Sequence, residues 1–144
     1  DIDESRMSEP VHPPIRVGID LVQISRIAES LECHGQSFLD RVFTRDEVAY
    51  ALDCPPRTLE RLAARFAAKE ATMKVLRVDS YAIGWREVEV RRLSSGACEL
   101  ILHGRAAELA RERGAADFAV SLSHDGDYAT AVVVSRRMDT HVAD

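Results

Sequence analysis

Short segments in which apolar and polar residues alternate predict β-strands along the chain. Val17, Ile19 and Leu21 alternate with Gly18 and Asp20, which predicts a short strand with one apolar face. The same period of two predicts further strands over residues 87–91, 98–102, 118–122 and 128–134. Two turn sequences, Ser-Ser-Gly at 94–96 and His-Asp-Gly-Asp at 124–127, are expected to close hairpins between neighbouring strands.

Apolar residues at helical spacing predict three or four helices between these strands. One covers about residues 25–31, and a second short helix begins after Thr44, with Glu47 three residues on as in a capping box. A longer helix is predicted over about residues 58–76, and another over 105–113 with Gly114 at its end. Together these elements predict an α+β fold, in which a mostly antiparallel sheet packs with a long helix.

The predicted long helix carries charged residues on its apolar side. At about 100° per residue, Glu70 falls near the middle of an apolar stripe, and Lys69 and Lys74 fall on its two edges. Burying an unpaired carboxylate is costly, so Glu70 needs either a partner or a function. The structural alternative is an ion pair between Glu70 and Lys74, four residues apart on the helix. The stripe consists of Leu59, Leu62, Ala63, Phe66 and Met73.

Asp20 is a second candidate for a functional carboxylate. It stands near the C-terminal end of the first predicted strand, a position from which functional carboxylates often project. The alternative is a turn aspartate that accepts backbone hydrogen bonds. If the two elements converge, Asp20 and Glu70 together suit Mg²⁺, which prefers a few carboxylates plus phosphate and water oxygens.

A serine, a histidine and an aspartate lie close together in residues 121–125. They are too close in sequence for a hydrolase triad, whose members come from separate elements. His124 is therefore either a residue that caps a hairpin or one that contacts a ligand. The glycine-rich fingerprints of dinucleotide-binding and P-loop proteins do not occur in the sequence.

Length and composition indicate one globular domain. The chain has 144 residues, of which 46% are apolar and 30% charged. We expect the domain to cover residues 15–136, between a disordered lead (1–14) and a polar C-terminal tail (137–144). The net charge of −5 argues against a nucleic-acid partner, and no apolar run is long enough to cross a membrane. The three scattered cysteines and a start without an apolar signal core predict a cytoplasmic protein.

Three sequence motifs carry a resemblance to a known family. They are VGIDLV at 17–22 followed by SRI at 25–27, RFAAKEA at 65–71 followed by Lys74, and VSLSHD at 120–125. Two weaker matches, WREVEV at 85–90 and LHGRA at 102–106, lie between them. In this order and spacing, over roughly residues 16–135, the chain resembles the holo-acyl-carrier-protein synthase family of 4′-phosphopantetheinyl transferases.

The resemblance implies a specific reaction. Such enzymes move the phosphopantetheine arm of coenzyme A to a serine of an apo acyl carrier protein and release adenosine 3′,5′-bisphosphate. Asp20 and Glu70 would hold Mg²⁺ against the coenzyme A pyrophosphate, and Lys74 would complete the catalytic set. Lys74 would either deprotonate the serine hydroxyl, directly or through water, or hold phosphate charge.

The resemblance also implies residues for each binding partner. Coenzyme A would be bound by Lys69, Lys74, His124 and Arg65. The alternative role of His124 is to orient Asp20. The acidic carrier protein would be bound by Arg26, with Arg41 and Arg45 extending the patch or being ordinary surface arginines. Many members of the family form homotrimers with active sites between subunits, so a homotrimer is expected here.

Two departures from the family pattern leave alternatives open. Residues 77–79 are Arg-Val-Asp, where the family usually has a glycine-bearing turn, so coenzyme contacts there are in question. Cys98 stands where the family has a proline. The altered turn motivates an alternative function, a non-catalytic carrier-protein-binding module, and a third is another Mg²⁺-dependent phosphate-transfer enzyme on the same scaffold.

Overall fold

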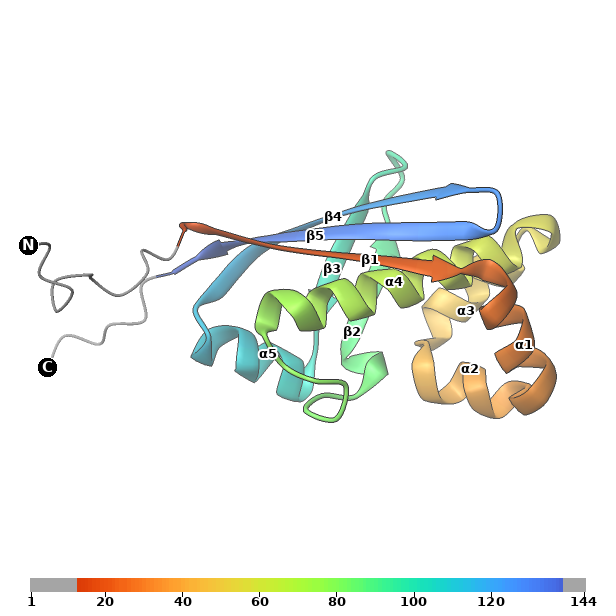
Figure 1. Cartoon of the computed structure of the whole chain (residues 1–144), viewed down its shortest axis with the longest axis horizontal. Helices are drawn as coiled ribbons and strands as arrows, with labels where there is room; N and C mark the ends of the chain where they lie inside the picture. The colour runs from red at the N-terminus through yellow and green to blue at the C-terminus, as the bar shows by residue number, and fades with distance from the viewer. Residues whose placement is uncertain (1–12, 139–144) are drawn as a thin grey trace, which may run out of the picture.

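The computed structural model describes residues 13–138, and its strands form two antiparallel groups (Figure 1). Strands β1 (Ile15–Gln23), β5 (Tyr128–Arg137) and β4 (Ala115–Asp125) form a three-stranded sheet in the order β1-β5-β4. Strands β2 (Val88–Arg92) and β3 (Cys98–Leu102) form a separate hairpin. All of the strand pairings are antiparallel, so the α+β prediction and both hairpins are confirmed.

Five α-helices join these strands in the described part of the chain. They are α1 (Ile24–His34), α2 (Gln36–Val42), α3 (Arg45–Leu52), α4 (Thr58–Leu76) and α5 (Gly104–Glu112), with short 3₁₀ turns at Pro55–Arg57 and Trp85–Glu87. Helix α2 was not predicted. It follows α1 directly, because Gly35 adopts a positive φ of 51° and turns the chain between the two helices.

The capping box predicted at Thr44 is present in the structure. The Thr44 hydroxyl accepts a hydrogen bond from the Glu47 N–H, and the Glu47 carboxylate accepts one from the Thr44 N–H. These contacts start α3 as the sequence predicted, since they satisfy two N–H groups that the helix itself cannot.

The predicted domain limits differ slightly from the ends of the sheet. Strand β5 reaches Arg137, whose N–H donates a hydrogen bond to the carbonyl of Pro14 at 2.7 Å. The ordered sheet therefore includes the first residue of the predicted tail. Residues 1–12 of the predicted lead and residues 139–144 of the predicted tail lie outside the described residues. None of the described helices has the length and apolarity that a membrane span requires.

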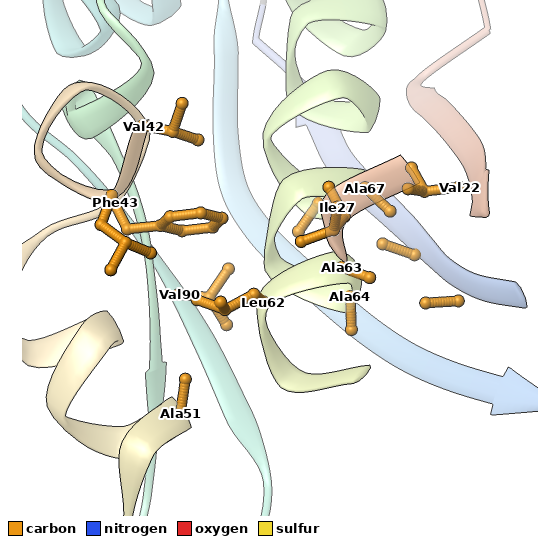
Figure 2. Packing of buried hydrophobic residues seen from close by; sticks show 14 residues of the cluster. Val22, Ile27, Val42, Phe43, Ala51, Leu62, Ala63, Ala64, Ala67 and Val90 are labelled. Carbon is orange, nitrogen blue, oxygen red and sulfur yellow. The ribbon is translucent and has the colours of Figure 1, made fainter. Parts of the chain in front are cut away.

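Helix α4 lies at the centre of the molecule and is buried on most of its surface. It packs between the three-stranded sheet and the β2–β3 hairpin, with α3 against its N-terminal half (Figure 1). Figure 2 shows alanines of α4 close to the sheet, whereas Leu62 lies on the side of α4 toward Phe43 and Val90, in the same buried cluster. The prediction of a single apolar stripe is therefore wrong: Lys69 is completely buried, whereas Leu59 is 37% exposed.

The apolar face of β1 points away from this core. Gly18 and Val22 are buried toward α4. The alternate residues are more than half exposed: Ile15 54%, Val17 65%, Ile19 59% and Leu21 64%. The predicted strand is confirmed, but its apolar side forms an open surface. In the sheet register, Val132 and Val134 of β5 lie beside Ile19 and Val17.

Candidate active site

Asp20 and Glu70 come together because β1 and α4 approach each other closely. A Cβ atom on Gly18 would lie 2.2 Å from the carbonyl oxygen of Ala71, closer than any real contact allows. Glycine is therefore required at this crossing. Asp20 follows two residues later on the same side of β1, and Glu70 directly precedes Ala71. The crossing brings two carboxylates 50 residues apart close enough for the charge of Asp20 to act on Glu70.

Electrostatics also link the two carboxylates. The pKa of Glu70 is raised above its ordinary value, first by burial and second by the negative charge of Asp20, while Lys74 partly opposes the shift. No hydrogen bond or ion pair of the Glu70 carboxylate occurs among the described residues. Two neighbouring carboxylates of which one is unpaired are suited to a divalent cation, which would lower the repulsion between them.

Lys74 pairs with Asp20 and not with Glu70. Its ammonium donates hydrogen bonds to the carbonyl of Ile19 at 2.7 Å and to Asp20 Oδ1 at 3.3 Å. The predicted alternative, an intrahelical pair between Glu70 and Lys74, is therefore not formed. The backbone carbonyl of Asp20 accepts a hydrogen bond from the Thr130 hydroxyl at 2.7 Å, which adds a contact between β1 and β5. Asp20, Glu70 and Lys74 thus form one cluster at the β1–α4 crossing.

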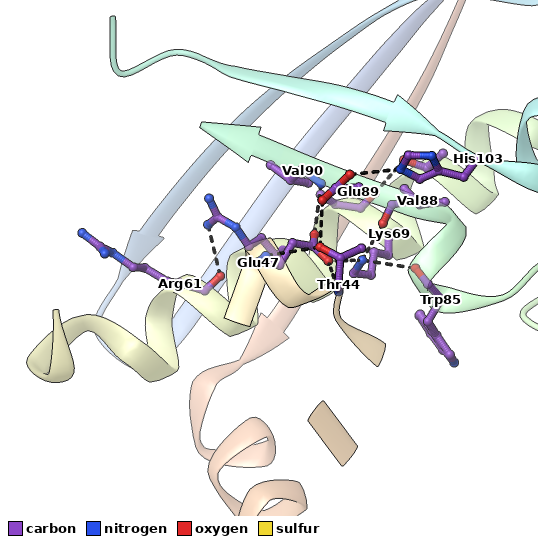
Figure 3. Close-up of polar contacts among 12 residues, drawn as sticks. Thr44, Glu47, Arg61, Lys69, Trp85, Val88, Glu89, Val90 and His103 are labelled. Atoms are coloured by element: carbon purple, nitrogen blue, oxygen red, sulfur yellow. Dashed lines mark hydrogen bonds and ion pairs between the residues drawn. The ribbon is translucent and has the colours of Figure 1, made fainter. Parts of the chain in front are cut away.

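Lys69 points to the opposite side of α4, into the core. Its ammonium forms an ion pair with Glu47 at 2.8 Å and donates to the carbonyls of Trp85 and Val88 (Figure 3). Both charged side chains are 0% exposed. The expected role of Lys69 in coenzyme A binding does not fit this arrangement, because all three ammonium protons are used inside the protein.

Glu47 contacts α4 through Lys69, and the sequence did not predict this contact. Besides Lys69 and the Thr44 N–H, its carboxylate accepts a hydrogen bond from the Val90 N–H at 3.0 Å. It therefore joins α3, α4 and β2 in one buried contact (Figure 3). Burial lowers the pKa of Lys69, although the charge of Glu47 acts in the opposite direction.

Arg65 and His124 line a basic cleft at the N-terminal end of α4. The cleft encloses about 230 Å³, and we call it the arginine cleft. Its other cationic residues, Arg57, Arg61 and Arg92, were not singled out in the sequence, although Arg57, Arg61 and Arg65 recur every four residues. Neither Asp20 nor Glu70 lines this cleft. Within one chain, the four predicted coenzyme-binding residues are thus divided among three places.

Tyr50 orders the arginines of this cleft. The guanidinium groups of Arg61 and Arg65 lie 4.0 and 4.3 Å from the centre of its ring. Arg65 is buried, its Nε has no hydrogen-bond partner among the described residues, and burial lowers its pKa. His124 forms an ion pair with Glu60 of α4 at 2.8 Å when it is protonated. Its alternative role, orienting Asp20, is not supported because Glu60 is its partner.

The three arginines expected to bind a carrier protein are all exposed. Arg26 lies on α1, Arg41 on α2, and Arg45 on α3. These three helices pack together at one end of the molecule (Figure 1). Arg45 also lines a pocket of about 490 Å³ that includes Phe43 and Arg86. The structure thus places the three predicted residues on one helical end of the domain.

Known proteins are similar in sequence to this chain over most of its length. The sequence profile of the 4′-phosphopantetheinyl transferase superfamily matches residues 16–133. A holo-[acyl-carrier-protein] synthase of Gloeobacter violaceus is 47% identical over 118 residues, which cover 82% of this chain and 89% of the relative. One from Moorella thermoacetica is 46% identical over 120 residues, covering 83% and 92%.

Solved structures give the same family. The complex of ACPS with CoA from Chronobacterium ammoniagenes has a TM-score of 0.77 at 35% identity, covering 88% of this chain and all of that one. The Helicobacter pylori holo-[acyl-carrier-protein] synthase in complex with coenzyme A has a TM-score of 0.72 at 28% identity, covering 83% and 98%. These matches confirm the fold and the resemblance that the motifs indicated. The chain belongs to the 4′-phosphopantetheinyl transferase superfamily.

Proposed function

We propose that this protein transfers the 4′-phosphopantetheine group of coenzyme A to a serine of an apo acyl carrier protein. The relatives named above support this activity, and two of the similar structures are complexes with coenzyme A. The structural observation that carries the proposal is the pairing of Asp20 with Glu70 at the β1–α4 crossing. A non-catalytic binding module would have no need for two adjacent carboxylates, whose negative charges repel each other.

Mg²⁺ is the metal that these residues suit. Asp20 and Glu70 would hold it, because Mg²⁺ is usually bound by one or two carboxylates together with substrate phosphates and water. The described residues contain no group of three or more His, Cys, Asp or Glu side chains suited to a metal, so phosphate and water oxygens would have to supply the other ligands of Mg²⁺. When bound, Mg²⁺ would neutralise charge on the pyrophosphate of coenzyme A.

The reaction joins the serine oxygen of the carrier to the phosphorus that bears pantetheine. The bond from this phosphorus to the bridging oxygen breaks, and adenosine 3′,5′-bisphosphate leaves with that oxygen, while the proton of the serine hydroxyl passes to water. Lys74 donates hydrogen bonds to Asp20 and to the Ile19 carbonyl beside it. This placement supports the second of its two predicted roles, in which its ammonium holds phosphate charge.

We propose that the working enzyme is a homotrimer whose active sites lie between subunits. The exposed apolar side of β1, with Ile15, Val17, Ile19 and Leu21, supports an interface there, since monomers rarely leave such a continuous apolar strand uncovered. An intersubunit site would also bring the arginine cleft of one chain to the carboxylates of another, which are separate within one chain. Arg65 and His124 would then hold coenzyme A phosphates from the neighbouring subunit.

The carrier protein is proposed to dock on the helical end formed by α1, α2 and α3. Exposed arginines on all three helices, Arg26, Arg41 and Arg45, would attract an acidic partner despite the net charge of −5. We place the reaction in the cytoplasm, which is consistent with the three free cysteines.

The direct test is the mass of an apo carrier protein after incubation with this protein, coenzyme A and Mg²⁺. We expect the mass to rise by one phosphopantetheine group, and EDTA to prevent the change. Several carrier proteins should be tried, from fatty-acid and from secondary-metabolic systems. Carrier binding without any change in mass, with all carriers tried, would contradict the proposed activity and favour the binding module.

A mixing experiment tests the intersubunit site. Glu70→Gln removes a proposed metal ligand, and Arg65→Gln removes a cation from the arginine cleft, so each variant alone should be inactive or weak. If the site combines two subunits, co-refolding the two variants restores part of the activity, because some sites receive intact residues from both chains. Activity that stays at the level of the single variants in confirmed mixed oligomers would contradict an intersubunit site.

A further inference from the structure

A second basic pocket lies at the C-terminal end of α4, where this helix meets the start of β1. It encloses about 210 Å³ and is distinct from the arginine cleft. Four of its eight lining residues are cationic, and none of the described residues that line it is acidic. We call it the basic pocket, and its cationic members are Arg16, Lys74, Arg77 and Arg137.

Arg16 has hydrogen-bond donors that no described residue satisfies. Its Nε and Nη1 atoms are buried and make no hydrogen bond. Buried polar atoms without partners are uncommon in folded proteins because their desolvation is costly. Burial and the positive charges of Arg77, Arg137 and Arg113 lower the pKa of Arg16, so its cationic neighbours repel it.

Helix capping accounts for only part of this cluster. Cations are favoured near a helix C-terminus, and Arg113 donates to the carbonyls of Leu76 and Arg77 at 3.3 and 3.2 Å. Lys74 is held by Asp20. The guanidinium of Arg77, in contrast, makes no hydrogen bond or ion pair with any described residue. Neither capping nor ion pairing therefore explains Arg16 and Arg77.

The backbone of Arg77 adds a second reason to look for a role of its side chain. Arg77 ends α4 with φ 57° and ψ 45°, a left-handed conformation that glycine adopts most readily. The resemblance noted from the sequence places a glycine-bearing turn here. This chain instead carries an arginine at a position where a side chain strains the backbone.

We propose that the basic pocket binds a phosphate group through the guanidinium groups of Arg16 and Arg77. Arginine forks match phosphate oxygens and form strong charge-assisted hydrogen bonds. The enclosed shape and the buried donors of Arg16 suit a compact anion better than a flat acidic protein surface. The phosphate comes either from inorganic phosphate or from a phosphate ester of the coenzyme A type. Because Lys74 lines the pocket, an anion bound there lies beside the proposed active site.

Phosphate binding to the full chain tests this proposal without any coenzyme or carrier. Calorimetric titration with inorganic phosphate, at constant ionic strength, should give saturable binding, and phosphate should raise the melting temperature. We expect Arg16→Gln and Arg77→Gly each to weaken binding at least tenfold. Arg111→Gln, which removes the same charge from the exposed side of α5, should bind phosphate as the unchanged protein does.

Arg77→Gly separates loss of binding from loss of folding. Glycine suits the left-handed backbone at this position, so the melting temperature without phosphate should stay the same or rise. Normal phosphate affinity in both pocket variants, or an equal loss in Arg111→Gln, would overturn the proposal. Binding of an acidic carrier protein but not of phosphate, lost in both pocket variants, would also overturn it.

The source of the phosphate is found by repeating the titrations with coenzyme A. If the pocket holds a coenzyme phosphate, coenzyme A binds more weakly to both pocket variants and competes with inorganic phosphate. If it holds free phosphate, coenzyme A affinity is unchanged in the variants and the two ligands bind together. Because no transfer is measured, failure of the proposed activity would leave these results unaffected.

Discussion

Gly18 in β1 lies so close to Ala71 in α4 that a Cβ atom at Gly18 would be 2.2 Å from the Ala71 carbonyl oxygen. A Gly18→Ala substitution must therefore push the strand and the helix apart. We expect a loss of about 1–3 kcal/mol in the free energy of unfolding, as for other overpacked cores. The same displacement should separate Asp20 from Glu70, so transfer activity should fall even in protein that remains folded.

Gly84→Ala is the matched control for this substitution. Gly84 has an ordinary extended backbone, and a Cβ atom there would have its nearest neighbour at 3.7 Å. Denaturant unfolding and transfer rates measured on both variants separate close packing from the loss of a glycine as such. If Gly18→Ala were as stable and as active as Gly84→Ala, the close crossing of β1 and α4 would not be what assembles the site.

The buried ion pair between Lys69 and Glu47 predicts a large effect on stability. Lys69→Met leaves the Glu47 carboxylate buried without its cation, which typically costs about 3–5 kcal/mol. Glu47→Gln removes the same charge pair from the other side while keeping an oxygen for the Thr44 N–H. Denaturant unfolding should show a lower free energy of unfolding for each of the two variants.

The double variant distinguishes a coupled pair from two independent buried residues. With both charges removed, neither side chain is left as an uncompensated ion, so the double variant should be less destabilised than the sum of the two single variants. We expect a coupling energy of more than about 1 kcal/mol from the double-mutant cycle. Effects that add to within about 0.5 kcal/mol would mean that the ion pair contributes little.

Asp127 holds the start of α1 from the turn between β4 and β5. Its carboxylate accepts hydrogen bonds from the Ser25 N–H at 3.0 Å and the Ser25 hydroxyl at 2.7 Å. Asp127→Ala should cost about 0.5–2 kcal/mol, as for the loss of other helix N-cap contacts. Asp125→Ala, across the same turn, is the control. Equal melting temperatures for the two variants would show that this contact does not stabilise α1.

The raised pKa of Glu70 predicts how stability depends on pH and on metal. Its proton is held more tightly in the folded protein, so this contribution to stability is complete below the ordinary value of 4.5. It is lost as the pH rises through the higher folded pKa. At pH 7 with EDTA, Glu70→Gln should therefore melt at the same or a higher temperature than the unchanged protein. Mg²⁺ should raise the melting temperature of the unchanged protein only. Equal Mg²⁺ stabilisation of both proteins would contradict a role for Glu70 as a metal ligand.

Features set by neighbouring residues could be predicted from the sequence. The Thr44–Glu47 capping box needs residues only three positions apart, and the β2–β3 hairpin needs one short turn. Gly18 and Asp20 could be identified as a motif for a similar reason. The missed helix α2 has no side-chain cap and depends on the positive φ of Gly35, which leaves a weak local signal.

Features that depend on distant contacts could not be predicted in this way. The helical period located Lys69 at the edge of a stripe, but its burial depends on Glu47, 22 residues away, and on backbone carbonyls of a separate hairpin. The alternation in β1 indicated an apolar face correctly. Whether Ile19 or Asp20 faces α4 depends on the close crossing at Gly18, which periodicity does not contain.

Asp20 and Glu70 are the proposed metal-binding pair of a phosphopantetheinyl transferase. The most direct measurement is the initial rate at which an apo carrier protein gains mass from coenzyme A, over a range of Mg²⁺ concentrations. Glu70→Gln should reduce the rate by more than about 100-fold, since metal stabilisation of the reacting phosphate amounts to several kcal/mol. Glu108→Gln, on the exposed face of α5, should leave it unchanged. A Glu70→Gln protein with the full rate and the same Mg²⁺ dependence would contradict the role of Glu70 as a metal ligand of the transfer reaction.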